Sequence, residues 1–131
     1  MAESPATLAF AVELFSGMGL MEARRMFGGA GLYARDVMFG LIDDDVIYLK
    51  VDGALKAELA AIGSRPWVYT QTKGPKAGVP QETSYWSLPE AALDDPDEAC
   101  AWGVRSLAAA EALKAAKPVR PRRSLDRTME G

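Results

Sequence analysis

Two short apolar runs separated by three aspartates constrain the fold of this chain more than any other feature. The runs are residues 37–42 and 46–51, and the aspartates are residues 43–45. Short runs rich in β-branched and aromatic residues indicate strands, and a brief polar connection joins two strands as a hairpin. A turn at residues 35–36 adds a strand at residues 32–33. The three strands form an antiparallel meander, because such short connections leave no room for parallel crossovers.

The remaining elements follow from helical spacing and from capping residues. Apolar spacing predicts helices over about residues 5–17, 54–62 and 96–117, the last capped by Asp95, with a short helical turn after Pro89. Two more strands are expected at residues 67–70 and 85–88, joined by a long loop over residues 71–83. The order α-β-β-β-α-β-β-α predicts a two-layer α+β domain, with helices packed on an antiparallel five-stranded sheet.

The charge of the chain changes at its C-terminal end. Residues 117–131 hold five basic and two acidic residues, whereas the preceding 116 residues have a net charge of −6. We therefore expect a folded domain over residues 1–117 and a basic disordered tail over residues 118–131. Three arginines of the tail are candidate nucleic-acid contacts, because each neutralised phosphate adds to affinity: Arg120, Arg122 and Arg123. A solvated tail is the alternative.

Histidine is absent, and Cys100 is the single cysteine. The commonest general base and the commonest metal ligand are therefore missing, and an internal disulfide is excluded. We expect no enzymatic activity, no cofactor and no metal. The sequence shows neither the pattern of a signal peptide nor an apolar run long enough to span a membrane, so a cytoplasmic location is expected.

Gly28, Gly29 and Gly31 form a cluster that invites comparison with phosphate-binding loops. Such loops lead into a helix whose N-terminus binds the phosphate, whereas the residues that follow here indicate a strand. The interpretation that we favour is a bulge or a close approach of the backbone to a packed helix. A ligand pocket beside these glycines is the alternative, with Glu22, Asp36 or Tyr85 as its titratable group.

Arg25 and Lys50 would form a cationic patch near the glycines if their strands pair. Successive strand residues face opposite ways, so only one of Arg24 and Arg25 can join this patch. Two ordinary surface charges are the alternative interpretation.

The last predicted helix has apolar residues on two nearly opposite sides. One stripe comprises Cys100, Val104 and Leu107, and the other comprises Trp102, Ala109 and Leu113. A surface helix needs only one apolar stripe, so the second stripe predicts a contact with another copy of the protein, and hence a homodimer. The alternative is an alanine-rich helix tolerated in water, in which Trp102 alone packs.

The segment RMFGGAGLY at residues 25–33, with the apolar runs at 37–42 and 46–51, resembles the N-terminal domain of the TfoX/Sxy family. PWVY at residues 66–69, SYWSLPE at 84–90 and Trp102 extend the resemblance over about residues 5–115. The resemblance implies an α+β domain similar to secretion-chaperone-like folds. It also implies a cytoplasmic, non-enzymatic co-activator of transcription that regulates competence for DNA uptake.

Full-length regulators of this family carry a second, helical domain, and this chain has the basic tail in its place. The resemblance therefore leads us to expect a regulatory or protein-interaction module that stands alone and binds a protein partner. Its working surface would comprise Arg25, the glycine cluster, Lys50, Trp102 and Leu113. A nucleic-acid-binding accessory protein that acts through the basic tail is the alternative.

Overall fold

The computed structural model describes residues 5–19, 21–26, 29–70, 73–75 and 77–116. Its helices are α1 (Pro5–Leu14), α2 (Gly53–Ala61) and α3 (Pro96–Ala116), with short 3-10 helices η1 (Ser16–Met18) and η2 (Glu90–Asp94). Its strands are β1 (Glu22–Met26), β2 (Gly29–Ala34), β3 (Val37–Asp43), β4 (Val46–Lys50), β5 (Pro66–Thr70) and β6 (Pro80–Ser87). The predicted α+β class and antiparallel sheet are confirmed.

The sheet has six strands in the order β1-β2-β3-β4-β6-β5, and every neighbouring pair is antiparallel. The expectation of five strands was wrong, because it missed β1. The sequence of β1, EARRM, lacks the β-branched and aromatic residues that mark a strand. Its pairing with β2 places it at an edge of the sheet, where charged residues are common because one side of the strand faces solvent.

Two-residue turns close the first two hairpins of the predicted meander. Arg35 and Asp36 join β2 to β3, and Asp44 and Asp45 join β3 to β4; all four have φ between 51° and 62°. Positive φ at both central residues is the type I′ geometry that matches the twist of a hairpin, and aspartate tolerates it. Asp43 is the last residue of β3 and lies outside the turn.

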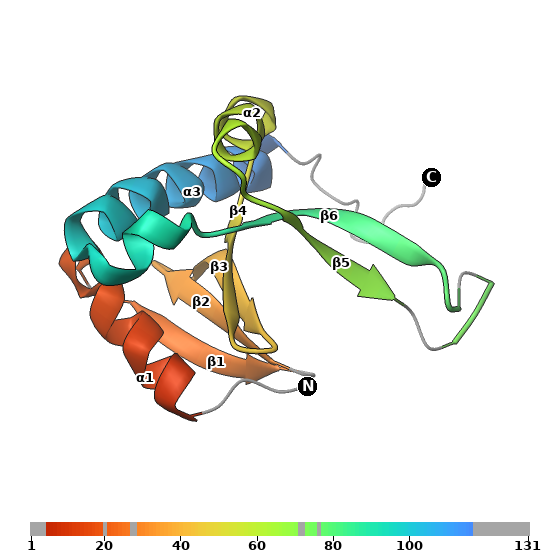
Figure 1. Cartoon of the computed structure of the whole chain (residues 1–131), viewed down its shortest axis with the longest axis horizontal. Helices are drawn as coiled ribbons and strands as arrows, with labels where there is room; N and C mark the ends of the chain where they lie inside the picture. The colour runs from red at the N-terminus through yellow and green to blue at the C-terminus, as the bar shows by residue number, and fades with distance from the viewer. Residues whose placement is uncertain (1–4, 20, 27–28, 71–72, 76, 117–131) are drawn as a thin grey trace, which may run out of the picture.

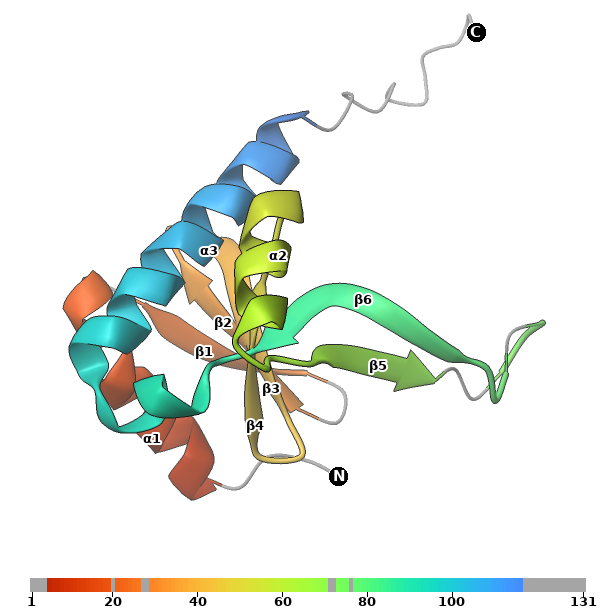
Figure 2. The same ribbon diagram turned by 45° about the horizontal axis from the view of Figure 1, so that its top comes forward.

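The three helices cover one face of the sheet (Figure 1). Ile47 and Leu49 of β4 point to this face and lie in the main core with Phe15, Phe39 and Leu107. A smaller core joins α2 to β6 through Leu55, Leu59 and Trp86, and Trp102 packs against both cores. α2 and α3 lie side by side (Figure 2), where Arg105 makes an ion pair with Glu58.

The β5–β6 hairpin extends away from the helices as an arm (Figures 1 and 2). Because β6 already begins at Pro80, residues 80–83 of the predicted loop belong to a strand. Residues 48–50 of β4 are in register with β6, and one backbone hydrogen bond flanks them on each side, so a short segment of sheet connects the arm to the rest of the domain.

Candidate functional site

The face of the sheet that turns away from the helices carries a cluster of aromatic side chains. Strand residues alternate between the two faces, so Tyr48 and Lys50 point away from the helices while Ile47 and Leu49 point toward them. The register places Tyr85 of β6 opposite Lys50. Because of this alternation, the face of β4 and β6 that turns away from the helices carries the aromatic side chains of Tyr48 and Tyr85, whereas the aliphatic core residues lie on the other face.

Trp67 lies at the centre of this cluster. Its ring centroid is 6.4 Å from that of Tyr48, 5.9 Å from that of Tyr69 and 6.4 Å from that of Tyr85. The contact with Tyr85 is edge-to-face, the arrangement that the charge distribution of aromatic rings favours. We call these four residues the aromatic row.

Charged groups lie beside two residues of the aromatic row. The Lys50 ammonium lies 4.9 Å from the Tyr85 ring centroid and donates a hydrogen bond to Ser84 Oγ at 2.6 Å. The central Trp67 donates a hydrogen bond from Nε1 to Asp43 Oδ2 at 3.0 Å. The row therefore has a cation beside Tyr85 and a carboxylate beside Trp67.

The fold raises the pKa of two tyrosines on this face. Burial raises the pKa of Tyr48, and Asp43 and Asp44 raise it further. Burial also raises the pKa of Tyr85, with an additional contribution from Tyr33. The hydrogen bond from Trp67 on β5 to Asp43 on β3 spans β6 and β4, so the sheet curls toward this face.

The structure does not bring Arg25 and Lys50 together. Arg25 pairs with Ala30, and the register continues through Ile42 to Ile47, which places Arg25 on the helix side of the sheet. Lys50 lies on the opposite side and three strands away. The predicted cationic patch is therefore not formed.

Arg24 is the arginine of β1 that shares a face with Lys50. Its guanidinium lies 4.2 Å from the Tyr33 ring centroid, and its Nη2 donates to Asp36 Oδ1 at 2.9 Å. It also donates to Glu22 at 3.2 Å. These two carboxylates, which were candidate titratable groups, thus form ion pairs and raise the pKa of Arg24.

The glycine cluster opens a strand, and Gly28 lies outside the described residues. A Cβ on Gly29 would stand 2.1 Å from the carbonyl oxygen of Ile42 on the neighbouring β3. Gly31 is buried in β2 and pairs with Arg24 on one side and Leu41 on the other. The close approach is to a neighbouring strand and not, as expected, to a helix.

The two apolar stripes predicted for α3 do not form two separate apolar surfaces, because each stripe contains both buried and exposed residues. In the first stripe Leu107 is buried but Val104 is 53% exposed. In the second, Ala109 is buried, Trp102 packs into both cores and Leu113 is 40% exposed. Within its own chain α3 packs against η1, η2, β3 and β4, and it meets α2 through the exposed ion pair between Arg105 and Glu58.

Cys100 of α3 faces η1 and α1. Its Sγ donates a hydrogen bond to the carbonyl oxygen of Leu14 at 3.5 Å, and a Cβ on Gly17 would stand 3.1 Å from the sulfur. The side chain therefore fills a packed contact between helices, as expected of a small apolar residue.

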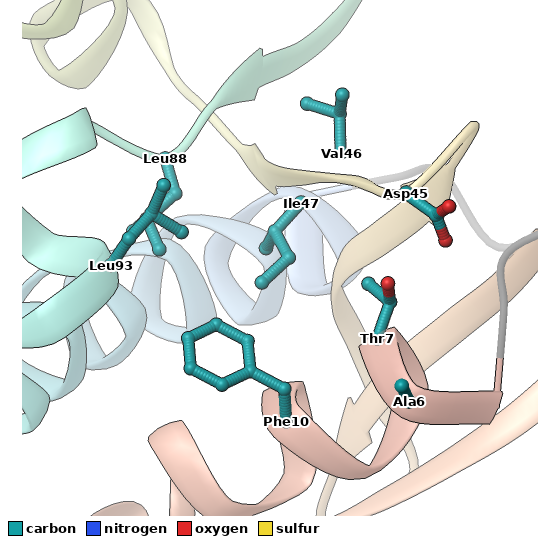
Figure 3. A pocket seen from close by; sticks show the side chains of 8 residues that line it. All are labelled: Ala6, Thr7, Phe10, Asp45, Val46, Ile47, Leu88 and Leu93. Atoms are coloured by element: carbon teal, nitrogen blue, oxygen red, sulfur yellow. The ribbon is translucent and has the colours of Figure 1, made fainter.

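An apolar cleft lies between α1, β4 and η2 (Figure 3), and no pattern in the sequence predicted it. It encloses about 430 Å³. Phe10, Ile47, Leu88 and Leu93 point toward one another across it (Figure 3). These side chains come from three separate elements, so only the folded chain brings them together. The cleft can accept an apolar side chain but offers no group for catalysis among these four residues.

Three predicted contacts, Arg120, Arg122 and Arg123, lie outside the described residues. Within the described part of the chain, no group of three or more cysteine, aspartate or glutamate residues is arranged to hold a metal ion. None of the helices there is long and apolar enough to cross a membrane.

The fold and its surface define a small α+β domain with a curled antiparallel sheet, helices on one face and aromatic residues on the other. The family model of the TfoX N-terminal domain matches residues 13–110 of the 131-residue chain, from within α1 to within α3. The chain therefore belongs to the TfoX N-terminal domain family. Comparison with curated proteins finds no match.

Proposed function

We propose that this protein is a non-enzymatic regulatory module that binds a protein partner in transcription control. Membership of the TfoX N-terminal domain family carries this proposal, because the match spans nearly the whole folded domain. The same membership supports a role in competence regulation and a cytoplasmic location.

The chemistry of the aromatic row supports recognition of a partner. Tyrosine and tryptophan are enriched at the energetically important centres of protein interfaces, because they bury large surfaces at little entropic cost. Tyr69 is 47% exposed. The β5 arm thus offers the partner an aromatic contact with a hydroxyl group at its end.

Binding to purified components of the transcription machinery tests this function. We expect the full chain to bind RNA polymerase or a DNA-bound activator from the source organism in biolayer interferometry. Tyr69→Ala should weaken that binding by about tenfold, as truncation of an interface aromatic does. The matched control is Val79→Ala, since Val79 is 50% exposed but lies outside the aromatic row. Binding to none of these components would contradict the proposal.

We also propose that the chain forms a homodimer through the solvent side of α3. The second stripe predicted for α3 supports this surface through Leu113, which is 40% exposed. Light scattering at increasing concentration tests it: a dimer that Leu113→Glu converts to a monomer is expected, and a monomer throughout would contradict it.

The alternative function is nucleic-acid binding through the basic tail. The observation that favours it is the charge of residues 117–131, with five basic and two acidic residues. Fluorescence anisotropy with duplex DNA should then show affinity that falls steeply with salt, because phosphate contacts release counterions. The triple variant R120A/R122A/R123A should abolish this binding, and unchanged binding would exclude the tail as the contact.

A further inference from the structure

We propose that the apolar cleft between α1, β4 and η2 binds an amphipathic helix of a partner protein, with apolar residues on one face and lysine or arginine on the other. Ile47, which lines the cleft, points to the helix side of the sheet, so the cleft and the aromatic row lie on opposite faces. Binding here rests on the proposed function, that of a protein-interaction module, and adds the chemistry of the segment that the module recognises.

The cleft exposes large apolar side chains that the fold does not cover. Phe10 of α1 is 42% exposed, and Val46 and Leu93, which also line the cleft, are exposed as well. Ile47 and Leu88, which face Phe10 and Leu93 in Figure 3, are buried members of the main core. Because core packing fixes this part of the cleft before a partner arrives, little conformational freedom is lost on binding.

The backbone of β4 is already paired beside the cleft. β3 and β6 flank β4 in the sheet, Ile42 pairs with Ile47, and the Ile47 carbonyl oxygen accepts a hydrogen bond from the Leu88 amide at 2.9 Å. A partner strand needs a free sheet edge, whereas an amphipathic helix binds a groove through apolar side chains at positions i, i+3, i+4 and i+7. The cleft is therefore suited to a helix that inserts side chains.

The charges around the cleft favour a cationic partner. Figure 3 shows Asp45 near Thr7, at the end of the cleft away from Leu93. The charged residues of α1, the turn between β3 and β4, and η2, all within the described residues, are acidic: Glu13, Asp44, Asp45, Glu90 and Asp94. Lys50 of β4 points to the other face, and Arg25, on the helix side, lies three strands away from β4. Lysine or arginine beside the apolar anchors would thus complement the cleft.

Titration of the isotopically enriched full chain with two synthetic peptides of about 14 residues, roughly four helical turns, tests this docking. Both peptides carry leucines at positions i, i+3, i+4 and i+7, and their opposite face carries lysines in one and glutamates in the other. We expect the lysine peptide to shift the amide signals of Ile47 and Leu88 and to leave that of Tyr69 unchanged. It should bind about tenfold more tightly than the glutamate peptide at low salt, and salt should reduce this ratio.

Two variants of α1 test the apolar contact. Phe10→Ala should weaken binding of the lysine peptide by about tenfold, as loss of an interface aromatic does. Val12→Ala is the matched control, because Val12 is 37% exposed on the same helix but lines a separate groove beside β1. It should change the affinity by less than about twofold. Thermal unfolding of both variants checks that the fold is intact.

Charge variants test the electrostatic part without removing an apolar side chain. The double variant D44N/D94N should weaken binding of the lysine peptide by about threefold, in keeping with two exposed ion pairs. Asparagine tolerates the positive φ of residue 44, so the turn should be retained. Glu82→Gln on β6 removes a carboxylate outside these segments and should leave the affinity unchanged.

Four outcomes would overturn the proposal: no shift with the lysine peptide, shifts confined to the aromatic face, equal affinity of the two peptides, or equal losses in F10A and V12A. Signals of Ile47 and Leu88 that move when the chain alone is diluted would also overturn it, because a second copy would then cover the cleft. Failure of the transcription components to bind would contradict the proposed function alone, since these peptides are synthetic.

Discussion

Trp67 on the edge strand β5 donates an indole hydrogen bond to Asp43 on β3, although β4 and β6 lie between these two strands. The indole reaches across because the sheet curls toward its aromatic face. This contact fixes the arm to the body of the domain beside the short pairing of β4 with β6, in which three residues are in register and one backbone hydrogen bond flanks them on each side.

Trp67→Phe should lower the free energy of unfolding by about 1–2 kcal/mol, because it removes a hydrogen bond to a charged acceptor. Urea denaturation measures the change, and hydrogen exchange should show faster opening of β5 than of β3. Asp43→Asn retains an acceptor oxygen and should cost less than half as much. Equal exchange rates in β5 of wild type and W67F would show that the contact does not hold the arm.

Gly40→Ala should destabilise the domain by about 2 kcal/mol. Its Cβ would stand 2.7 Å from the carbonyl oxygen of Tyr48, so the backbone of β4 would have to shift. Gly53→Ala is the matched control, because nothing lies within 4 Å of that added Cβ at the start of α2. The control should be neutral or stabilising by about 0.5 kcal/mol. Thermal and urea unfolding of the two variants gives the comparison.

Trp102→Ala should cost about 3 kcal/mol of stability, because this side chain packs against both hydrophobic cores. Val104→Ala, two residues away, should change stability by less than about 0.5 kcal/mol, since its side chain is exposed. Chemical denaturation separates these outcomes. A loss of partner binding in W102A with unchanged stability would instead assign Trp102 to an interaction surface.

The stability of the domain should fall at alkaline pH through Tyr85. Its pKa is raised in the fold, chiefly by burial. As the pH rises, the unfolded chain loses the Tyr85 proton before the folded chain does. The contribution of Tyr85 to the free energy of unfolding is therefore complete below the ordinary tyrosine pKa and is lost as the pH rises through the raised pKa of the folded state. Tyr85→Phe should flatten this alkaline loss in urea denaturation. Ser84→Ala removes the hydrogen-bond acceptor of Lys50 without removing a phenol, so it should retain the loss.

Local patterns allowed most of the elements to be predicted. The hairpin turn at residues 44–45 and the cap of α3, where Asp95 accepts from the Glu98 amide, depend on neighbours in the sequence. β1 was missed because its residues have no strand preference of their own and its strand forms by pairing with β2. β1 is therefore stabilised by its contacts with the neighbouring strand and not by the preferences of its own residues.

The aromatic row could not be predicted because it depends on the order of strands. Tyr48 and Trp67 meet only because β6 inserts between β4 and β5 and the sheet curls. The separation of Arg25 from Lys50 has the same origin, since the register that assigns Arg25 to the helix side runs through four strands. Neither property is encoded within a single segment.

The packing of Cys100 against Leu14 and the η1 segment makes the domain suitable for thiol-labelling experiments without any mutation. As the only thiol of the chain, and partly exposed, it should react with an alkylating reagent faster when α1 and η1 separate from α3 than in the closed fold. Labelling rates across urea concentrations would distinguish local opening of this helical contact from unfolding of the whole sheet.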